Sequence, residues 1–243
     1  MFSRILAAPI DAIVHALQYL FGLDKVSTLV YNLDPASGDV LTGNIGPFYP
    51  YEWTLIGRWY FALAGFLGAF ILLAIAISAY KMAVPGKDNP GERAEAKMGI
   101  VYSVGAILVV MATPLFFQLF AAINNSLVNF FYMLAHGVLK NELDLVGTFD
   151  ALITNDWNPL VAAIVKFAAW GAVVGVNILY VIRKMMLVVL LISTPVLAGM
   201  WAASRSKYVI EMWAGEILTN LFMQTAHAMV WTLLLVFLKV WTS

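Results

Sequence analysis

The lengths of the charge-free stretches constrain this chain more than any other feature. A transmembrane helix needs about 20 consecutive apolar residues to cross a hydrocarbon core roughly 30 Å thick. The 22 residues from Trp59 to Tyr80 carry no charge, and neither do the 42 residues from Met98 to Leu139. Hydrophobic residues make up 62% of the chain and charged residues 12%, which is too few charges to cover a water-soluble domain. We therefore expect a multi-spanning membrane protein.

The positions of the charges divide the chain into about five predicted membrane spans. They cover residues 59–80, 98–123, 160–182, 185–204 and 217–238. The second span is expected to leave the membrane at Asn124-Asn125, because 42 charge-free residues are too many for one crossing. The expected fold class is all-α: a polytopic membrane helix bundle of about five transmembrane helices, forming one domain over residues 54–243.

The first 22 residues predict an amphipathic helix that lies in the membrane interface. Apolar residues recur at helical spacing from Phe2 to Leu20, with polar residues between them. A secretory signal peptide fits less well, because Pro9 and Asp11 interrupt the apolar core, and a sixth span is a further alternative. Residues 23–53 are rich in turn-forming residues and form the predicted extracytoplasmic connector.

A basic loop between the first two predicted spans suggests the orientation of the chain. It contains the densest group of basic residues, namely Lys81, Lys87, Arg93 and Lys97. Placing this loop in the cytoplasm predicts an N-terminus outside and a C-terminus inside. The same assignment puts Arg205 and Lys207 outside, which the positive-inside rule disfavours, unless the fourth span turns back at Pro195.

Polar side chains within the predicted spans are the candidate site residues, because a polar group in hydrocarbon needs a partner or water. They are Asn220, Gln224, His227, Lys166, Asn177 and Gln118. Three of them, Asn220, Gln224 and His227, share one helix face at i, i+4 and i+7. One interpretation is that these side chains form hydrogen bonds between helices and so fix the packing. The other is that they line a conduit.

Two prolines within the predicted spans, Pro114 and Pro195, are expected to break their helices, because proline lacks a backbone donor. Catalytic and metal-binding signatures are not found. The chain has no cysteine, three widely separated histidines, and neither a nucleotide-binding glycine loop nor a nucleophile elbow. We therefore expect a protein that is not an enzyme and that holds no cofactor or metal.

Several short motifs, taken in order, resemble those of a known family. They are the segment Asn89 to Lys97 (NPGERAEAK), Ala112-Thr113-Pro114-Leu115, Asn124-Asn125, Arg183-Lys184, Ser193-Thr194-Pro195, and Trp213 followed by Gln224 and His227. Each motif is short, and the order and spacing carry the likeness. The chain in this respect resembles the TrbL-like polytopic inner-membrane subunits of conjugative type IV secretion systems.

This resemblance implies a multi-pass subunit of the cytoplasmic (inner) membrane that contributes to the conduit for DNA or protein–DNA transfer. It implies other secretion subunits as partners, including the secretion ATPases, with membrane lipid around the helices. It also implies transient contact with DNA or nucleoprotein and assembly as a homo-oligomer. Lys87, Arg93 and Lys97 would then form the ATPase-docking loop. The alternatives are a stand-alone small-solute channel or transporter and a passive structural membrane anchor.

Overall fold

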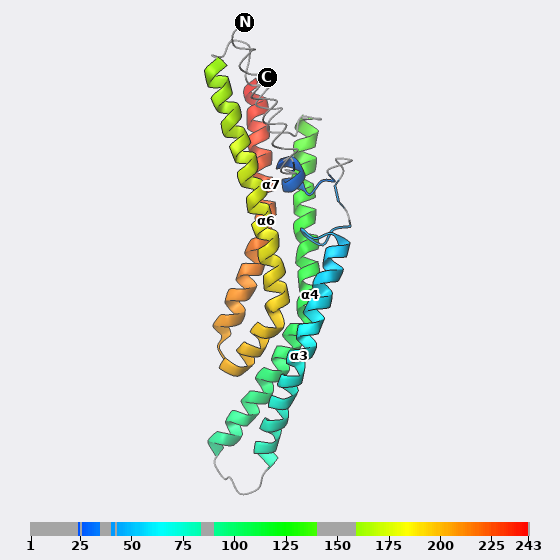
Figure 1. Ribbon diagram of the computed structural model, residues 1–243, viewed down its shortest axis with the longest axis vertical. Helices are drawn as coiled ribbons and strands as arrows, with labels where there is room; N and C mark the ends of the chain where they lie inside the picture. The colour runs from blue at the N-terminus through cyan, green and yellow to red at the C-terminus, as the bar shows by residue number, and fades with distance from the viewer. Residues whose placement is uncertain are drawn as a thin grey trace. The chain divides into compact units, whose positions relative to one another are not determined.

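The protein is all-α in its computed structural model, which describes residues 24, 26–34, 40–41, 43–83, 90–139 and 159–242. These residues form a short helix and four long ones: α2 (Val26–Tyr31), α3 (Pro50–Ala83), α4 (Pro90–Leu139), α6 (Pro159–Ser204) and α7 (Lys207–Thr242) (Figure 1). The four long helices are long and apolar enough to cross a membrane. The expected fold class, a polytopic membrane helix bundle, is confirmed.

The number of long helices differs from the expected five spans, because α6 runs without interruption through residues 160–182 and 185–204. The basic pair Arg183-Lys184 does not end a helix there. A charge marks a membrane boundary only when it is solvated, and Arg183 is 2% exposed. The expected interfacial helix over residues 1–22 lies outside the described residues, as do residues 140–158.

Pro114 lies inside α4 rather than at a helix end, so the expected helix break is wrong there. Proline removes the hydrogen bond that the carbonyl of Val110, four residues earlier, would accept. The hydroxyl of Tyr60 on α3 donates a hydrogen bond to this carbonyl instead. The hydroxyl of Thr113 donates to the carbonyl of Val109 over 2.7 Å. Side chains thus replace the missing backbone bond, which lets α4 continue.

Pro195 is likewise inside α6, and the helix break expected there is also wrong. The carbonyl of Leu190 near this proline accepts hydrogen bonds from the hydroxyls of Ser193, at 3.2 Å, and Thr194, at 3.0 Å. A third bond comes from the indole nitrogen of Trp213 on α7, at 3.2 Å. At both prolines, therefore, an adjacent threonine and an aromatic donor from a neighbouring helix support the backbone.

The chain divides into two compact units, each with its own apolar core. Unit 1 comprises residues 1–42, 123–184 and 222–243, and unit 2 comprises residues 43–122 and 185–221. The core of unit 1 contains Val26, Val30, Tyr31, Leu33, Val128, Ala135, Val173, Tyr180, Ala228 and Leu235. The main core of unit 2 contains Phe48, Ile56, Phe117, Ala121, Leu187, Leu191, Ile217 and Leu221.

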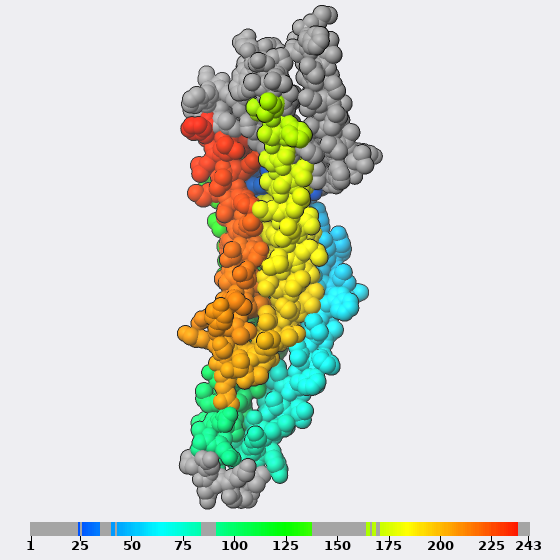
Figure 2. All heavy atoms as spheres, turned by 60° about the vertical axis from the view of Figure 1, so that its left-hand side comes forward, coloured from blue at the N-terminus to red at the C-terminus, as the bar shows by residue number. Residues whose placement is uncertain are grey.

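Within unit 2, α3 lies along the first part of α4 and exposes most of its own side chains (Figure 1). Only Ile56, Tyr60 and Ile71 of this helix are buried. Large apolar side chains such as Phe61 and Phe66 point outward, and the outer face of α3, cyan in Figure 2, is uncovered. Such a face is typical of a helix surrounded by lipid, because lipid tails are as apolar as the side chains.

The bond between Tyr60 and Val110 predicts a measurable loss of stability in Tyr60→Phe. The change removes only the hydroxyl, so the Val110 carbonyl loses its donor, at a cost of about 0.5–1.5 kcal/mol in the free energy of unfolding. Thermal unfolding of the detergent-solubilised chain would measure it. Tyr80→Phe is the matched control, because Tyr80 lies on the same helix and is 70% exposed. Equal melting temperatures for the two variants would contradict the role of Tyr60.

Candidate polar site in unit 1

A cluster of polar side chains lies inside unit 1, and Gln224 is at its centre. Gln224 on α7 is 2% exposed. Its Oε1 accepts a hydrogen bond from Nη2 of Arg183 on α6, at 3.3 Å, and one from Nδ2 of Asn124 on α4, at 3.4 Å. Oδ1 of Asn124 accepts from the hydroxyl of Thr225, at 2.8 Å. We call Asn124, Arg183, Gln224 and Thr225 the polar cluster; it joins three helices.

Arg183 is the charged member of the polar cluster, and its surroundings are suited to a buried cation. Its guanidinium carbon lies 5.4 Å from the centre of the Tyr180 ring, one helical turn away on α6. The negative face of an aromatic ring attracts a cation. The hydroxyl of Tyr180 in turn lies 3.3 Å from Nδ1 of His227. A chain of contacts therefore leads from Gln224 through Arg183 and Tyr180 to His227, which lies next to the polar cluster.

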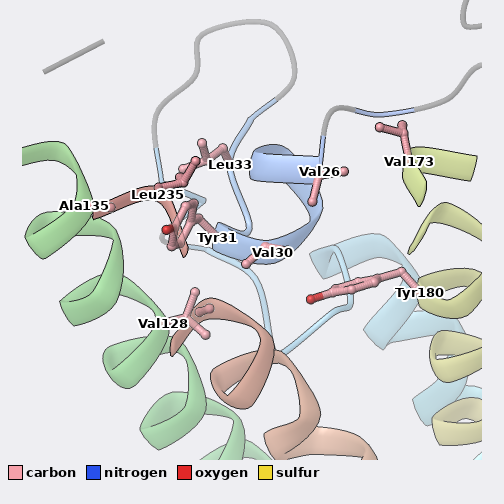
Figure 3. Close-up of a cluster of buried hydrophobic side chains, with 10 residues drawn as sticks. Val26, Val30, Tyr31, Leu33, Val128, Ala135, Val173, Tyr180 and Leu235 are labelled. Atoms are coloured by element: carbon pink, nitrogen blue, oxygen red, sulfur yellow. The ribbon is translucent and has the colours of Figure 1, made fainter. Parts of the chain in front are cut away.

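The short helix α2 is packed into the same unit. Figure 3 shows α2 between Val128 of α4 and Tyr180 of α6. Tyr31 at the end of α2 is fully buried, and its hydroxyl lies 2.8 Å from that of Thr232 on α7. Its ring meets that of Tyr132 edge to face. Burial raises the pKa of Tyr31 to about 12, so its hydroxyl stays protonated at physiological pH.

Amide side chains of α6 and α7 hold the backbone of the α2 segment. Asn177 on α6 accepts a hydrogen bond from the backbone nitrogen of Asp24 and donates one to its carbonyl, both at 3.0 Å. Nε2 of Gln224 donates to the carbonyl of Leu29, at 3.1 Å. The amide of Gln224 thus contacts α2 through its nitrogen and the polar cluster through its oxygen. The backbone of the α2 segment thus forms hydrogen bonds with polar side chains of the long helices.

The structure brings together some of the predicted site residues and separates others. Gln224, His227 and Asn177 all lie in unit 1, in the contacts above. Asn220 lies in unit 2, where its Nδ2 donates to the carbonyl of Glu216 on its own helix, at 2.9 Å. Gln118 is exposed on α4 in unit 2. Lys166 lies on α6, with its side chain outside the described part of the structure.

Sequence reasoning missed three members of the polar cluster as site residues: Asn124, Arg183 and Thr225. Asn124 was interpreted as a membrane exit and Arg183 as the boundary between two spans. The available signal was the long charge-free sequence that precedes Arg183 and follows Lys184. An arginine in such a setting indicates a functional or structural contact by default.

The predicted docking loop lies at a charged end of unit 2. Arg93 and Lys97 are exposed near the start of α4, whereas Lys87 lies outside the described residues. Nη2 of Arg205, in the turn between α6 and α7, lies 3.5 Å from Oε1 of Glu95 and 3.4 Å from its carbonyl oxygen. The turn between α6 and α7 is therefore at the same end of unit 2 as the start of α4.

The polar cluster predicts that Gln224→Leu destabilises the chain. Arg183 and Asn124 each lose an acceptor in the apolar interior, and we expect a cost of about 1–3 kcal/mol. Asn220→Leu, one turn earlier on α7, is the control, because the hydrogen bond that its side-chain amide loses lies within a single helix. Thermal unfolding in detergent would compare the two. If Gln224→Leu lost no more thermal stability than Asn220→Leu, the central position of Gln224 would be contradicted.

Comparison with known proteins identifies one part of the chain. Residues 51–120 match a family described as type IV secretion system pilin. The match covers less than a third of the chain and comprises most of α3 and the first part of α4, the helix pair of unit 2. No curated protein and no solved structure matches the chain. The pilin match supports a type IV secretion system family for this protein, and the resemblance to TrbL-like subunits is consistent with it.

Proposed function

We propose that this protein contributes to the membrane conduit through which a type IV secretion system transfers DNA or protein–DNA complexes. The family match and the four membrane-capable helices support a multi-pass type IV secretion subunit in general. The observation in favour of the conduit role is that the polar side chains of α4, α6 and α7 in unit 1 point toward one another and toward α2. The proposed role is structural and requires no catalysis.

The position of α2 limits how such a conduit would work. The backbone of α2 accepts from Gln224, and Tyr31 bonds Thr232, so α2 occupies the space that the polar groups surround. A conduit in unit 1 therefore requires α2 to leave its place during transfer. The hydrogen bonds that hold α2 are each worth about 0.5–1.5 kcal/mol and can be replaced by water. The apolar side chains Val26 and Val30 are buried in the core of unit 1, so their exposure adds to the cost of moving α2. A passive anchor, in contrast, would keep α2 in place.

A reversible cross-link between α2 and α7 distinguishes these two roles. The chain has no cysteine, so the double variant Tyr31→Cys with Thr232→Cys carries only the introduced thiols. A short bifunctional thiosulfonate reagent would link them, and a reductant would release them. We expect transfer of DNA between cells to be lost in the linked state and regained after reduction, because α2 cannot leave.

The matched control is Phe131→Cys with Thr232→Cys. The carbonyl of Phe131 accepts from Thr232 over 3.2 Å, so this link ties α4 to the same position on α7 and leaves α2 free to move. Equal transfer in the linked and reduced states of the α2 variant would contradict the conduit role and favour a passive anchor. Loss of transfer in the linked control, with normal transfer in the linked α2 variant, would also contradict the proposed movement of α2.

The contact between Arg205 and Glu95 supports a revised membrane topology. An unbroken α6 crosses the membrane once, so the turn after it and the start of α4 lie on one side. Placing this side in the cytoplasm puts Arg205 and Lys207 inside together with the loop after Lys81, which agrees with the positive-inside rule. Four crossings then place both chain ends outside, unlike the five-span prediction of an inside C-terminus. The secretion ATPases would dock on the joint surface of Arg93, Lys97 and this turn.

Single cysteines at Asn89, Ser206 and Ser243 test this topology in intact cells. We expect a membrane-impermeant thiol reagent to label position 243 from outside, while positions 89 and 206 react only after the membrane is opened. A five-span chain with an uninterrupted fourth span would instead expose position 206 and protect position 243. Labelling of position 206 from outside would therefore overturn the four-span proposal.

A further inference from the structure

An apolar groove lies between α4 and α7 in unit 2. Its volume is about 410 Å³. Its lining residues include Ala112, Thr113 and Phe116 of α4 and Ile210, Trp213 and Ala214 of α7. All of them lie on the two membrane-capable helices α4 and α7.

The few polar atoms in the lining are already bonded elsewhere. The hydroxyl of Thr113 donates to the carbonyl of Val109 within α4. The indole nitrogen of Trp213 donates to the carbonyl of Leu190 on α6. A buried water needs two to four polar partners, and apolar cavities stay dry and bind hydrophobic molecules. The groove is therefore suited to an apolar occupant.

The size of the groove selects among apolar occupants. One turn of an α-helix with its side chains is about 10–12 Å across and about 5.4 Å long, so even a single turn occupies more than the volume of the groove. A single flexible hydrocarbon chain is narrow enough to lie along the groove between the two helices. Membrane lipids supply such chains at high concentration wherever the groove is open to the bilayer.

The face of α7 that lines the groove begins with a cation. Lys207 starts the helical stripe that continues through Ile210, Ala214 and Ile217 at i+3, i+7 and i+10. Its side chain is 88% exposed, and its partner Glu211, 3.7 Å away, is 63% exposed. An exposed pair of this kind is weak, so the ammonium group can also bind a phosphate.

We propose that the groove between α4 and α7 binds one acyl chain of a membrane glycerophospholipid, with the phosphodiester of its head group at Lys207. This proposal does not depend on the role in secretion. The bound lipid would complete the packing of unit 2 between Phe116 of α4 and Trp213 of α7, where the protein itself leaves a gap.

Photo-cross-linking on the unmodified chain tests the site directly. The protein would be reconstituted in vesicles of phosphatidylethanolamine and phosphatidylglycerol that carry a trace of phosphatidylglycerol with a diazirine in its acyl chain. After extraction into mild detergent, only retained lipid can react on irradiation. We expect cross-links at the groove residues of α4 and α7. Cross-links spread over the outer face of α3, or no retained lipid, would overturn the proposal.

Variants that fill the groove give a second test. Ala112→Phe and Ala214→Phe each place a ring in the groove, and we expect native mass spectrometry to show loss of the retained lipid. Ala62→Phe is the matched control, because Ala62 is exposed on α3 and its replacement leaves the groove open. The melting temperature without added lipid would show whether each variant folds. If the folded groove-filled variants retained as much lipid as the control, the result would contradict the proposed site.

Removal of the cation tests the position of the head group. We expect Lys207→Ala to lower the amount of retained phospholipid about two- to fivefold, the range for an exposed ion pair. Cross-links would remain confined to the groove, because the acyl chain still binds there. Unchanged retention would contradict the placement of the phosphodiester at Lys207.

Discussion

The need of buried polar groups for hydrogen-bond partners is the constraint on which both units depend. Within apolar helices an unsatisfied polar group costs several kcal/mol, which strongly favours pairing. In unit 1 the amide of Gln224 joins Arg183, Asn124 and the carbonyl of Leu29. In unit 2 the same need appears at Pro114, where Tyr60 donates to the carbonyl of Val110, and Trp213 donates to the carbonyl of Leu190 near Pro195. Helices with few specific apolar contacts thus obtain defined neighbours from a small number of polar ones.

This constraint also frames the question of function. In the proposed conduit role, α2 bonded to Gln224 and Thr232 represents a closed state, and these groups would line the conduit once α2 has moved. A subunit of a transfer apparatus needs a closed state, because an open path across the membrane would dissipate its ion gradients. The pilin-like segment 51–120 lies in unit 2, whereas the polar cluster lies in unit 1. The part of the chain that carries the family match is therefore distinct from the part that carries the proposed conduit.

The sequence predicted the class of the protein and several of its contacts. Charge-free stretches longer than a bilayer crossing predicted membrane helices, and the structure has them. The stripe of Gln224 and His227 was predicted from helical spacing, and both residues face other helices. Asn220 shares that stripe and lies elsewhere, because helical spacing fixes a face within one helix and not the neighbours along its length. Arg183 was assigned to a boundary because charge in a sequence gives no information on burial.

The sequence by itself determined that the chain folds into long apolar helices, because hydrophobicity and helix length are properties of each segment alone. It also determined where the polar groups stand on those helices. Only the tertiary structure decided that α6 continues through Arg183 and Pro195, since the partners that make this possible come from α7. Likewise, only the tertiary structure placed α2 among the long helices of unit 1. Contacts between distant segments depend on how side chains fit together, and no local pattern contains that information.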